Sequence, residues 1–311
     1  MASLPRLHYR NVLPVVVDNG SEDGTVEELR ARHREIPVIE NQVNLGYAGG
    51  NNVGIRWALA RGVEYVCLVN NDTEVTAELV SALVHVARSD ARIGAVGARN
   101  LLMEDPSRLW GAYGVLTYGP FVVRTAGQGA RDGARWLEQR EVDWVIGNGC
   151  LWSRRALNDV GLLDESFFAY HDDVDWCLRA RRRGFRIVYA GAAAILHRGG
   201  ASSDLTQRHS FPQPYFLGRN GVIFVRKHAR AQECLRFAVL CGAAMAARWM
   251  RALLLRCWPA GRGPRARGRY LWAWEAAFGR GLLDALRGRP VPFGRLGLPN
   301  SSCSAPDIGR G

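Results

Sequence analysis

Residues 63–98 read VEYVCLVNNDTEVTAELVSALVHVARSDARIGAVGA. Two runs of apolar and β-branched residues, Val63–Val69 and Ile93–Ala98, are typical of buried strands. Between them, apolar residues recur at helical spacing over Ala77–Arg88, and Thr76 stands where the N-cap of that helix is expected. The stretch therefore predicts a strand–helix–strand unit, the repeat that builds α/β proteins with a mostly parallel sheet flanked by helices.

The same alternation extends along the chain on both sides. Near the N-terminus, Thr25 and Glu28 have the spacing of a capping box at a helix start. Ligands of such sheets bind beyond the carboxyl ends of the strands, so the residues after Val17 and Val69 are where chemistry is expected. The further expected elements are strands at Val12–Val17, Ile36–Glu40 and Ala190–Leu196, and helices at Thr25–Arg34 and Asn51–Ala60.

Polar residues follow both of these strands. Asp18 and Asn19 come after the first, and Asn70, Asn71 and Asp72 come after the second. A carboxylate in such a place can accept a hydrogen bond from a nucleoside or hold a divalent cation through its oxygens. Asp and Asn also dominate turns for conformational reasons alone. Taken singly, these residues fit a turn as well as a site.

A glycine-dense segment, NLGYAGGNNVG over residues 44–54, leads into the expected helix at Asn51. Glycine permits close approach of the backbone, and a helix start offers free amides to an anion. A phosphate cradle that includes Gly46 and Gly50 is therefore one interpretation. The spacing matches neither the dinucleotide-binding nor the P-loop pattern, so the segment alone does not decide.

The most distinctive segment is FFAYHDDVDWCLR at residues 167–179, at the start of a helix that ends near Gly184. Its carboxylates, Asp172, Asp173 and Asp175, repel one another unless a cation, an arginine or a proton compensates. Adjacent carboxylates suit general base catalysis because each raises the proton affinity of its neighbour. An acidic helix start is also favoured by the helix dipole, which accounts for one or two of the three.

His197 follows the expected strand Ala190–Leu196. A single histidine is more often a structural residue than a metal ligand, but its place at the end of a strand points toward the same edge of the sheet.

Charge divides the chain into two regions. Residues 1–225 contain 25 basic and 25 acidic side chains, whereas residues 226–311 contain 16 basic and 4 acidic ones. The N-terminal sequence MASLPRLHYRN has no apolar core of a secretory signal, so a cytoplasmic protein is expected. The seven cysteines are scattered without ligand spacing, which disfavours a zinc site or a disulfide scaffold.

The basic region contains an uninterrupted apolar run, Phe237–Ala247, followed by apolar residues and arginines. Because a membrane-spanning helix needs about 20 apolar residues, we expect an amphipathic helix that either lies on an anionic membrane or packs against the protein. An arginine-rich linker at residues 261–269 and a disordered tail at residues 291–311 are expected to follow. The expected organisation is a catalytic domain at residues 1–228, a helical extension at 229–290 and the tail.

Six segments, in this order and spacing, resemble the family 2 inverting glycosyltransferases of GT-A fold, and within them the bacterial rhamnosyltransferases of cell-wall and O-antigen polysaccharide synthesis. The resemblance covers residues 12–228 and includes YFLGRNGVIFVRKH near its end. The six segments are VVVDNGSEDGT, NLGYAGGNNVGI, CLVNNDTEV, VIGNGCLWSRRAL, GLLDESFFAYHDDVDWCLRARRRGF and ILHRGGAS.

The resemblance implies a role for each matching residue. Asp173, with Asp172 beside it, matches the carboxylate that deprotonates the acceptor hydroxyl. Asp72 matches the metal-binding DxD motif, whose first acid is Asn70 here, and His197 matches a histidine that completes the metal site in some relatives. The implied cation is Mg²⁺ or Mn²⁺. The implied donor-binding residues are Asp18, Asn19, Gly46, Gly50, Asn51, Asn71, Asp72, Gly147 and Asn148.

The implied reaction moves a sugar, with rhamnose from dTDP-rhamnose as one candidate, from a dTDP-, UDP- or GDP-linked donor to a glycan or lipid-linked glycan. The resemblance also implies an earlier strand and helix, with a V-x-x-x-Y-N segment, that the sequence before Val12 does not contain. The alternative is therefore a truncated remnant with impaired catalysis. A nucleic-acid-binding protein is a more distant alternative that rests only on the basic region.

Overall fold

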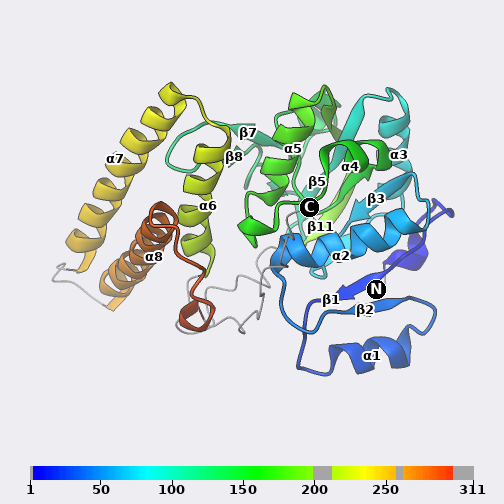
Figure 1. Ribbon diagram of the computed structural model, residues 1–311, viewed down its shortest axis with the longest axis horizontal. Helices are drawn as coiled ribbons and strands as arrows, with labels where there is room; N and C mark the ends of the chain where they lie inside the picture. Colours follow the sequence, from blue (N-terminus) through cyan, green and yellow to red (C-terminus); the bar gives the residue numbers. More distant parts are fainter. Residues whose placement is uncertain (1–2, 199–211, 257–261, 297–311) are drawn as a thin grey trace, which may run out of the picture.

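The computed structural model describes residues 3–198, 212–256 and 262–296. Residues 3–198 form a mixed α/β structure in which helices cover both faces of a central sheet, and α6, α7 and α8 form a helical bundle beside it (Figure 1). The helices are α1 (Thr25–Arg32), α2 (Gly46–Ala60), α3 (Leu79–Arg88), α4 (Arg154–Val160), α5 (Asp172–Arg182), α6 (Pro212–His228), α7 (Ala231–Arg256) and α8 (Arg262–Leu286), with 3₁₀ turns at Leu4–Arg6, Ala134–Trp136, Glu165–Phe167 and Phe293–Leu296.

The main sheet has the strand order β3-β10-β5-β11-β4, with β6 added to β5 and β9 added to β11. A separate parallel pair, β1 with β2, and a hairpin, β7 with β8, complete the described strands. The strands are β1 (Val16–Asp18), β2 (Val38–Glu40), β3 (Tyr65–Leu68), β4 (Thr73–Val75), β5 (Ile93–Leu102), β6 (Leu109–Gly111), β7 (Gly114–Leu116), β8 (Val123–Thr125), β9 (Arg140–Glu141), β10 (Cys150–Ser153) and β11 (Arg186–His197).

The expected α/β architecture is confirmed, but the main sheet is mixed rather than mostly parallel. β5 and β11 are parallel, whereas β10 runs antiparallel to both β3 and β5, and β4 runs antiparallel to β11. Helix periodicity between strands predicts parallel crossovers, but it gives no signal for a strand such as β10, which follows the short strands β6–β9 and enters the sheet in the reverse direction.

Alternation of side chains along the strands divides the core into two layers. On β10, Trp152 packs into the layer under α2, α4 and α5, while Leu151 faces the layer under α3. The indole of Trp152 stacks on that of Trp176 from α5, with ring centroids 4.2 Å apart. The α3 layer includes Leu79 and Leu83, both fully buried. Burial on both sides holds the carboxyl ends of β3 and β5 in a fixed relation, because packed interiors permit little movement.

Several local predictions were wrong in detail. The first strand begins at Val16 rather than Val12, and Thr25 is not an N-cap because its amide and hydroxyl donate to Asp23 Oδ1 instead (3.1 and 2.6 Å). Thr76 does not cap α3, since its hydroxyl donates to the carbonyl of Ala194 across the sheet. In each case the threonine hydroxyl donates a hydrogen bond to a group outside the helix and does not cap the helix.

The C-terminal region is more helical than the sequence indicated. The expected linker at residues 261–269 is helical from Arg262 onward, and α7 is continuous over 26 residues. Within the described residues, Ala231–Leu255 is the one helix long and apolar enough to cross a membrane by length and composition alone, which is weak evidence by itself. Phe293 in the expected tail packs against Phe168, with ring centroids 5.1 Å apart, and residues 297–311 lie outside the described residues.

Candidate functional site

Asp72 and His197 meet at one edge of the main sheet. In the antiparallel pair of β4 and β11, His197 lies opposite Thr73, which brings the preceding Asp72 beside the imidazole. His197 Nε2 and Asp72 Oδ1 are 3.2 Å apart, and both side chains are more than nine-tenths buried. The ring of Trp110 from β6 packs edge-on against His197, with centroids 4.9 Å apart. The two residues implied as metal ligands are therefore direct neighbours.

This pair offers a cation one carboxylate and one imidazole nitrogen. Among the described residues there is no group of three or more His, Cys, Asp or Glu side chains that could hold a metal by themselves. Mg²⁺ and similar ions are commonly bound by one or two protein ligands together with substrate phosphates and water. The donor set fits a cation that takes its remaining ligands from a diphosphate.

Asn148 holds the Asp72 turn from the neighbouring loop. Its Oδ1 accepts from the amide of Asn70 at 3.0 Å, and its Nδ2 donates to Thr73 Oγ1 at 2.8 Å. The two bonds lie on either side of Asp72, and Asn148 itself is buried. The side chain of Asn148 therefore helps to fix the turn that carries the Asp72 carboxylate.

Gly147, the preceding residue, contacts the second implied catalytic group. Its amide donates to Asp173 Oδ2 at 3.0 Å, and the amide of Val174 donates to Asp173 Oδ1 at 2.8 Å. Burial raises the pKa of Asp173 to about 6, although these two amides oppose the rise. A carboxylate with such a pKa is ionised at neutral pH and still basic enough to accept a proton from a hydroxyl during reaction.

Asp172 and His171 are more deeply buried than Asp173. Burial, and then the charge of Asp173, raise the pKa of Asp172 well above its ordinary value, which favours the neutral carboxyl. Burial lowers the pKa of His171 to about 4, so the imidazole is also neutral. Asp172 Oδ2 and both ring nitrogens of His171 have no hydrogen-bond partner among the described residues. Such unsatisfied groups are rare in folded proteins and mark places where a ligand or water completes the bonding.

Asp18 and Asn19 occupy a second cluster, on the turn after β1. Asp18 Oδ2 accepts from the amides of Gly20 and Ser21, at 3.1 and 2.9 Å. Asn19 Nδ2 donates to Asn44 Oδ1 and to the carbonyl of Gly46, while its Oδ1 accepts from Asn41 Nδ2 and from the amide of Leu45. These four bonds use the whole capacity of an amide side chain. Asn19 therefore shapes the loop before α2, and only Asp18 keeps an oxygen available.

The glycine-dense segment forms the first turns of α2 and is not a loop before it, because the helix begins at Gly46. Gly46 has φ +73°, and a Cβ there would lie 2.5 Å from Phe168. A Cβ at Gly50 would lie 3.1 Å from the Asn19 side chain. Both glycines thus permit close packing against neighbouring protein groups. Asn51 donates to the carbonyl of Tyr47 within α2.

Asn71 is exposed in the turn between β3 and β4. It lies beside Asp72 and carries no hydrogen bond that ties its side chain to the turn among the described contacts. Of the residues implied for donor binding, Asp72 belongs to the Asp72–His197 pair and Asn71 is its neighbour in the chain.

Tyr47 belongs to the site although no role was predicted for it. Its hydroxyl lies 2.9 Å from the point where a Cβ of Gly147 would stand, and Asp173 Oδ2 lies 3.5 Å from the same point. Burial, and then the nearby Cys150, Asp172, Asp173 and Asp72, raise the pKa of Tyr47 well above its ordinary value. The hydroxyl therefore stays protonated, as a donor near Gly147 and Asp173. Its position in the segment NLGYAGG was the available signal.

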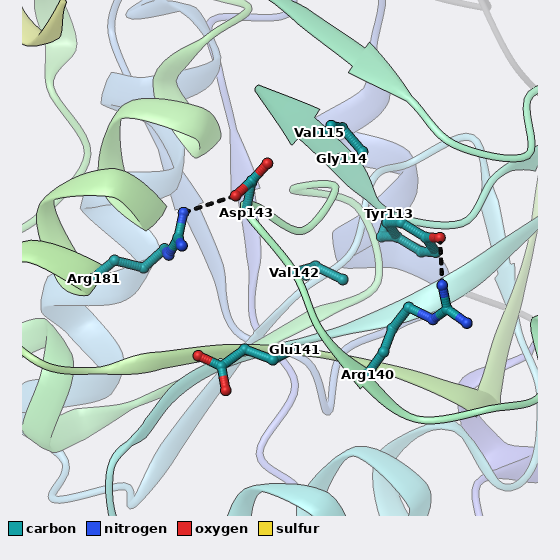
Figure 2. Close-up of a pocket in the computed structure, with 8 residues that line it drawn as sticks. All are labelled: Tyr113, Gly114, Val115, Arg140, Glu141, Val142, Asp143 and Arg181. Atoms are coloured by element: carbon teal, nitrogen blue, oxygen red, sulfur yellow. Dashed lines mark hydrogen bonds and ion pairs between the residues drawn. The ribbon is translucent and has the colours of Figure 1, made fainter. Parts of the chain in front are cut away.

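A cavity of about 230 Å³ lies away from these residues, beside β7 and β9 (Figure 2). Arg181 donates to Asp143 at 2.8 Å, and Arg140 donates to the Tyr113 hydroxyl at 2.8 Å (Figure 2). The charged groups that line it are paired with one another or with close neighbours, and none of the implied site residues lines it. The cavity is not the candidate site.

A model of the glycosyltransferase-like family 2 matches residues 2–213, about two thirds of the chain. The chain is a family 2 glycosyltransferase. The fold and the ordered motifs agree with this assignment, so the family expected from the sequence is confirmed.

Relatives with named activities cover much of the chain. It is 30% identical over 282 residues to an N-acetylglucosaminyl-diphospho-decaprenol L-rhamnosyltransferase of Mycobacterium tuberculosis, covering 76% of this chain and 89% of that protein. It is 29% identical over 218 residues to the low-salt glycan biosynthesis hexosyltransferase Agl10 of Haloferax volcanii, covering 66% of this chain and 64% of that protein. Identity to the dTDP-rhamnosyl transferase RfbF of Shigella flexneri is 25% over 237 residues, covering 73% of this chain and 75% of RfbF.

Solved structures share the fold of this glycosyltransferase. GalNAc-T7 with UDP, GalNAc and Mn²⁺ aligns with a TM-score of 0.51 over 63% of this chain and 39% of that chain, at 14% identity. S. aureus TarS in complex with UDP-GlcNAc aligns with a TM-score of 0.50 over 93% of this chain and 87% of that chain, also at 14% identity. At this identity the similarity establishes the GT-A architecture alone.

Proposed function

We propose that this glycosyltransferase catalyses an inverting transfer of a sugar, with rhamnose as the leading candidate, from a nucleotide donor to a glycan or lipid-linked glycan. The observation that carries the proposal is the Gly147–Asn148 pair, which joins the implied base to the implied cation site. Gly147 bonds to Asp173, and Asn148 holds the turn that carries Asp72. The names of the mycobacterial and Shigella relatives support rhamnose.

In this proposal Asp173 removes the proton of the acceptor hydroxyl as that oxygen attacks the anomeric carbon. The bond from this carbon to the diphosphate breaks in the same displacement, so no covalent intermediate forms. The amides of Gly147 and Val174 hold the carboxylate in place through both of its oxygens. The Tyr47 hydroxyl, close to Gly147, is placed to donate to a sugar oxygen.

Asp72 and His197 would hold a divalent cation, Mg²⁺ or Mn²⁺, together with the donor diphosphate. Such a cation stabilises negative charge on the departing diphosphate. Asn148 keeps Asp72 in position. Asp18 and Asn71 would contact the nucleotide, whereas Asn19, Gly46, Gly50 and Asn51 would act by shaping the backbone that faces it.

The base assignment is tested with Asp173→Asn. We expect transfer to fall by about 10³-fold, because a general base contributes roughly 10²–10⁴-fold. Affinity for the donor nucleotide, measured by calorimetry against dTDP, UDP and GDP with Mn²⁺, should change less than about threefold. Full transfer activity in this variant would refute the assignment.

The cation assignment is tested with Asp72→Ala in the same titrations. We expect the gain in nucleotide affinity that Mn²⁺ gives to the unchanged protein to disappear in the variant. Equal affinities with and without Mn²⁺ in the unchanged protein would refute a metal-dependent donor site.

The alternative is a chain with an impaired donor site. Among the described residues, β1 pairs only with β2 and β3 pairs only with β10, so each presents one edge without a strand partner. Unpaired edges of short strands are less stable than paired ones. A folded sample that binds none of the three nucleotides would favour this alternative over the active enzyme.

We further propose that α7 contacts an anionic membrane from the cytoplasmic side. One face of α7 exposes Leu235, Val239, Met250 and Leu254, which are 58–67% accessible. Arg236 and Arg251 are exposed on the same helix, as expected for an interfacial helix. We expect the protein to sediment with phosphatidylglycerol vesicles and less with phosphatidylcholine vesicles. No binding to either kind of vesicle would refute this contact.

A further inference from the structure

The loop before the catalytic helix α5 has an unusual backbone. Phe168, Tyr170 and His171 have φ values of 62°, 65° and 69°, a region that non-glycine residues rarely adopt. At Phe168 the amide of Ala169 donates to the carbonyl of Phe167 at 2.7 Å, which closes a strained γ-turn. Each such residue costs on the order of 1–3 kcal/mol and persists only where the surroundings hold it.

One asparagine side chain of α6 donates hydrogen bonds to carbonyl groups of this loop and of the residue before it. Asn220 is fully buried, and its Nδ2 donates to the carbonyls of Phe167, Ala169 and Tyr170 at 2.8, 2.6 and 2.9 Å. The neighbouring Arg219 donates to the carbonyl of Ser166 at 2.8 Å. The carbonyls of Phe167, Ala169 and Tyr170 are therefore bonded from α6, while the carbonyl of Phe168 accepts from the amide of Ala48 in α2 at 3.2 Å.

The C-terminal end of α6 contacts α5 at a second place. Asp175, also fully buried, lies 2.6 Å from His228 Nε2 and 2.7 Å from Lys227 Nζ, and it accepts from Arg179 at 2.8 Å. Although burial opposes ionisation, these partners lower the pKa of Asp175 to about 2. Asp172 and Asp173 thus lie between two attachments to α6.

We propose that Asn220 is a positioning residue for transfer, which holds the strained loop 168–171 so that Asp173 reaches the amide of Gly147. The inference rests on the proposed function, in which Asp173 is the base. Without the Asn220 amide, the loop relaxes toward negative φ and the start of α5 shifts. Asp173 then loses the bond from Gly147, while Asp18 and Asp72, which lie on other elements, keep their places.

The test compares Asn220→Leu with Asn52→Leu. Leu has the branched shape of Asn and the same number of side-chain heavy atoms, but it has no N–H donor. Asn52 is a matched control because it is equally buried and makes three bonds, one to Glu165 and two to the backbone of Leu163. Asn52 has no bond to the strained loop. Both variants lose buried hydrogen bonds of similar number, so they should lose similar stability.

For Asn220→Leu we expect kcat to fall by about 30–100-fold, since small displacements of a reacting group have effects of this size. The donor KM should change less than about threefold. The acidic limb of the pH–kcat profile should move to higher pH, because the Gly147 amide that favours the charged carboxylate is lost. Amide exchange in the peptide around Gly147 should become faster. Asn52→Leu should leave the acidic limb and this exchange unchanged.

The positioning role is overturned if Asn220→Leu lowers thermal stability as Asn52→Leu does, yet keeps kcat, the acidic limb and the Gly147 exchange of the unchanged protein. Where Asn220→Leu does not fold, Asn220→Ser retains one donor and must show the same changes to a smaller degree. If Asp173→Asn is inactive while Asn220→Leu is normal, only the positioning role fails. If Asp173→Asn keeps full activity, the base assignment fails and the positioning role with it.

Discussion

The turn after β1 and the loop before α5 both carry residues expected in the site, but they differ in how fully their polar side chains are hydrogen-bonded to the protein. On the turn, the Asn19 side chain makes four bonds to the protein. At the start of α5, Asp172 and His171 are buried with atoms that lack partners among the described residues, and the backbone is strained. Strain and unsatisfied groups persist where function requires them, while saturated groups support a fold.

The comparison separates two kinds of residue within a single family motif set. A motif residue whose hydrogen bonds all go to other groups of the protein acts by shaping the backbone. Substituting it should lower the free energy of unfolding. A motif residue with a perturbed pKa should determine how the rate of transfer depends on pH. Each prediction below tests one side of this distinction.

Of the predictions that follow from this comparison, the largest effect is on the rate of transfer at low pH. With Asp173 as the proposed base, transfer requires its ionised form, and its pKa is raised to about 6, mainly by burial. The carboxyl is about half ionised at pH 6 and about 1% ionised at pH 4, so kcat should fall roughly 50-fold between these pH values. The measurement is a pH–rate profile with saturating donor, with circular dichroism to show that the protein stays folded. A rate independent of pH over this range would place the chemistry elsewhere.

On the saturated side, Asn19→Ala should destabilise the protein. The variant leaves the amide of Leu45, the carbonyl of Gly46 and the side chains of Asn41 and Asn44 without their shared partner. We expect a loss of about 2 kcal/mol in the free energy of unfolding, measured by urea titration. Asn51→Ala, which removes one bond within α2, is the control and should cost less. Equal losses in the two variants would contradict a scaffold role for Asn19.

The sequence was sufficient for the fold class and for the neighbours Asp72 and His197, because strand periodicity and motif order place both at strand ends. It was not sufficient for strand direction, since the reversed β10 follows the short strands β6–β9 and not a helix with clear periodicity. It also placed Asn51 at a helix start, whereas α2 begins at Gly46 and its glycines face Phe168 and Asn19. Contacts between distant segments determine the direction of β10 and the start of α2, and local residue propensities carry no information about such contacts.

A residue of the candidate site could be predicted from the sequence where it acts through its own chemistry. It could not be predicted where it acts through contacts with residues far away in the chain. Asp173 stood out as one of three clustered acids. Asn220 and Tyr47 lie in quoted motifs, but nothing in their local sequence indicates that one bonds a strained loop and the other lies beside Gly147. Partners about 50 and 100 residues apart in the chain have no local signature.

The smallest expected effect concerns Asp172, and it tests whether the strained side is also a cost to stability. Burial raises the pKa of Asp172 in the folded protein above its value in the unfolded chain, so the folded state binds the extra proton. Stability from this proton is complete below about pH 4 and is lost as pH rises. Asp172→Asn is neutral at every pH and avoids this loss. Its advantage in unfolding free energy should therefore grow by about 1 kcal/mol from pH 4.5 to pH 5.5. A difference that does not change with pH would mean that Asp172 is ionised in the folded protein, and that the acidic start of α5 is as well satisfied as the turn after β1.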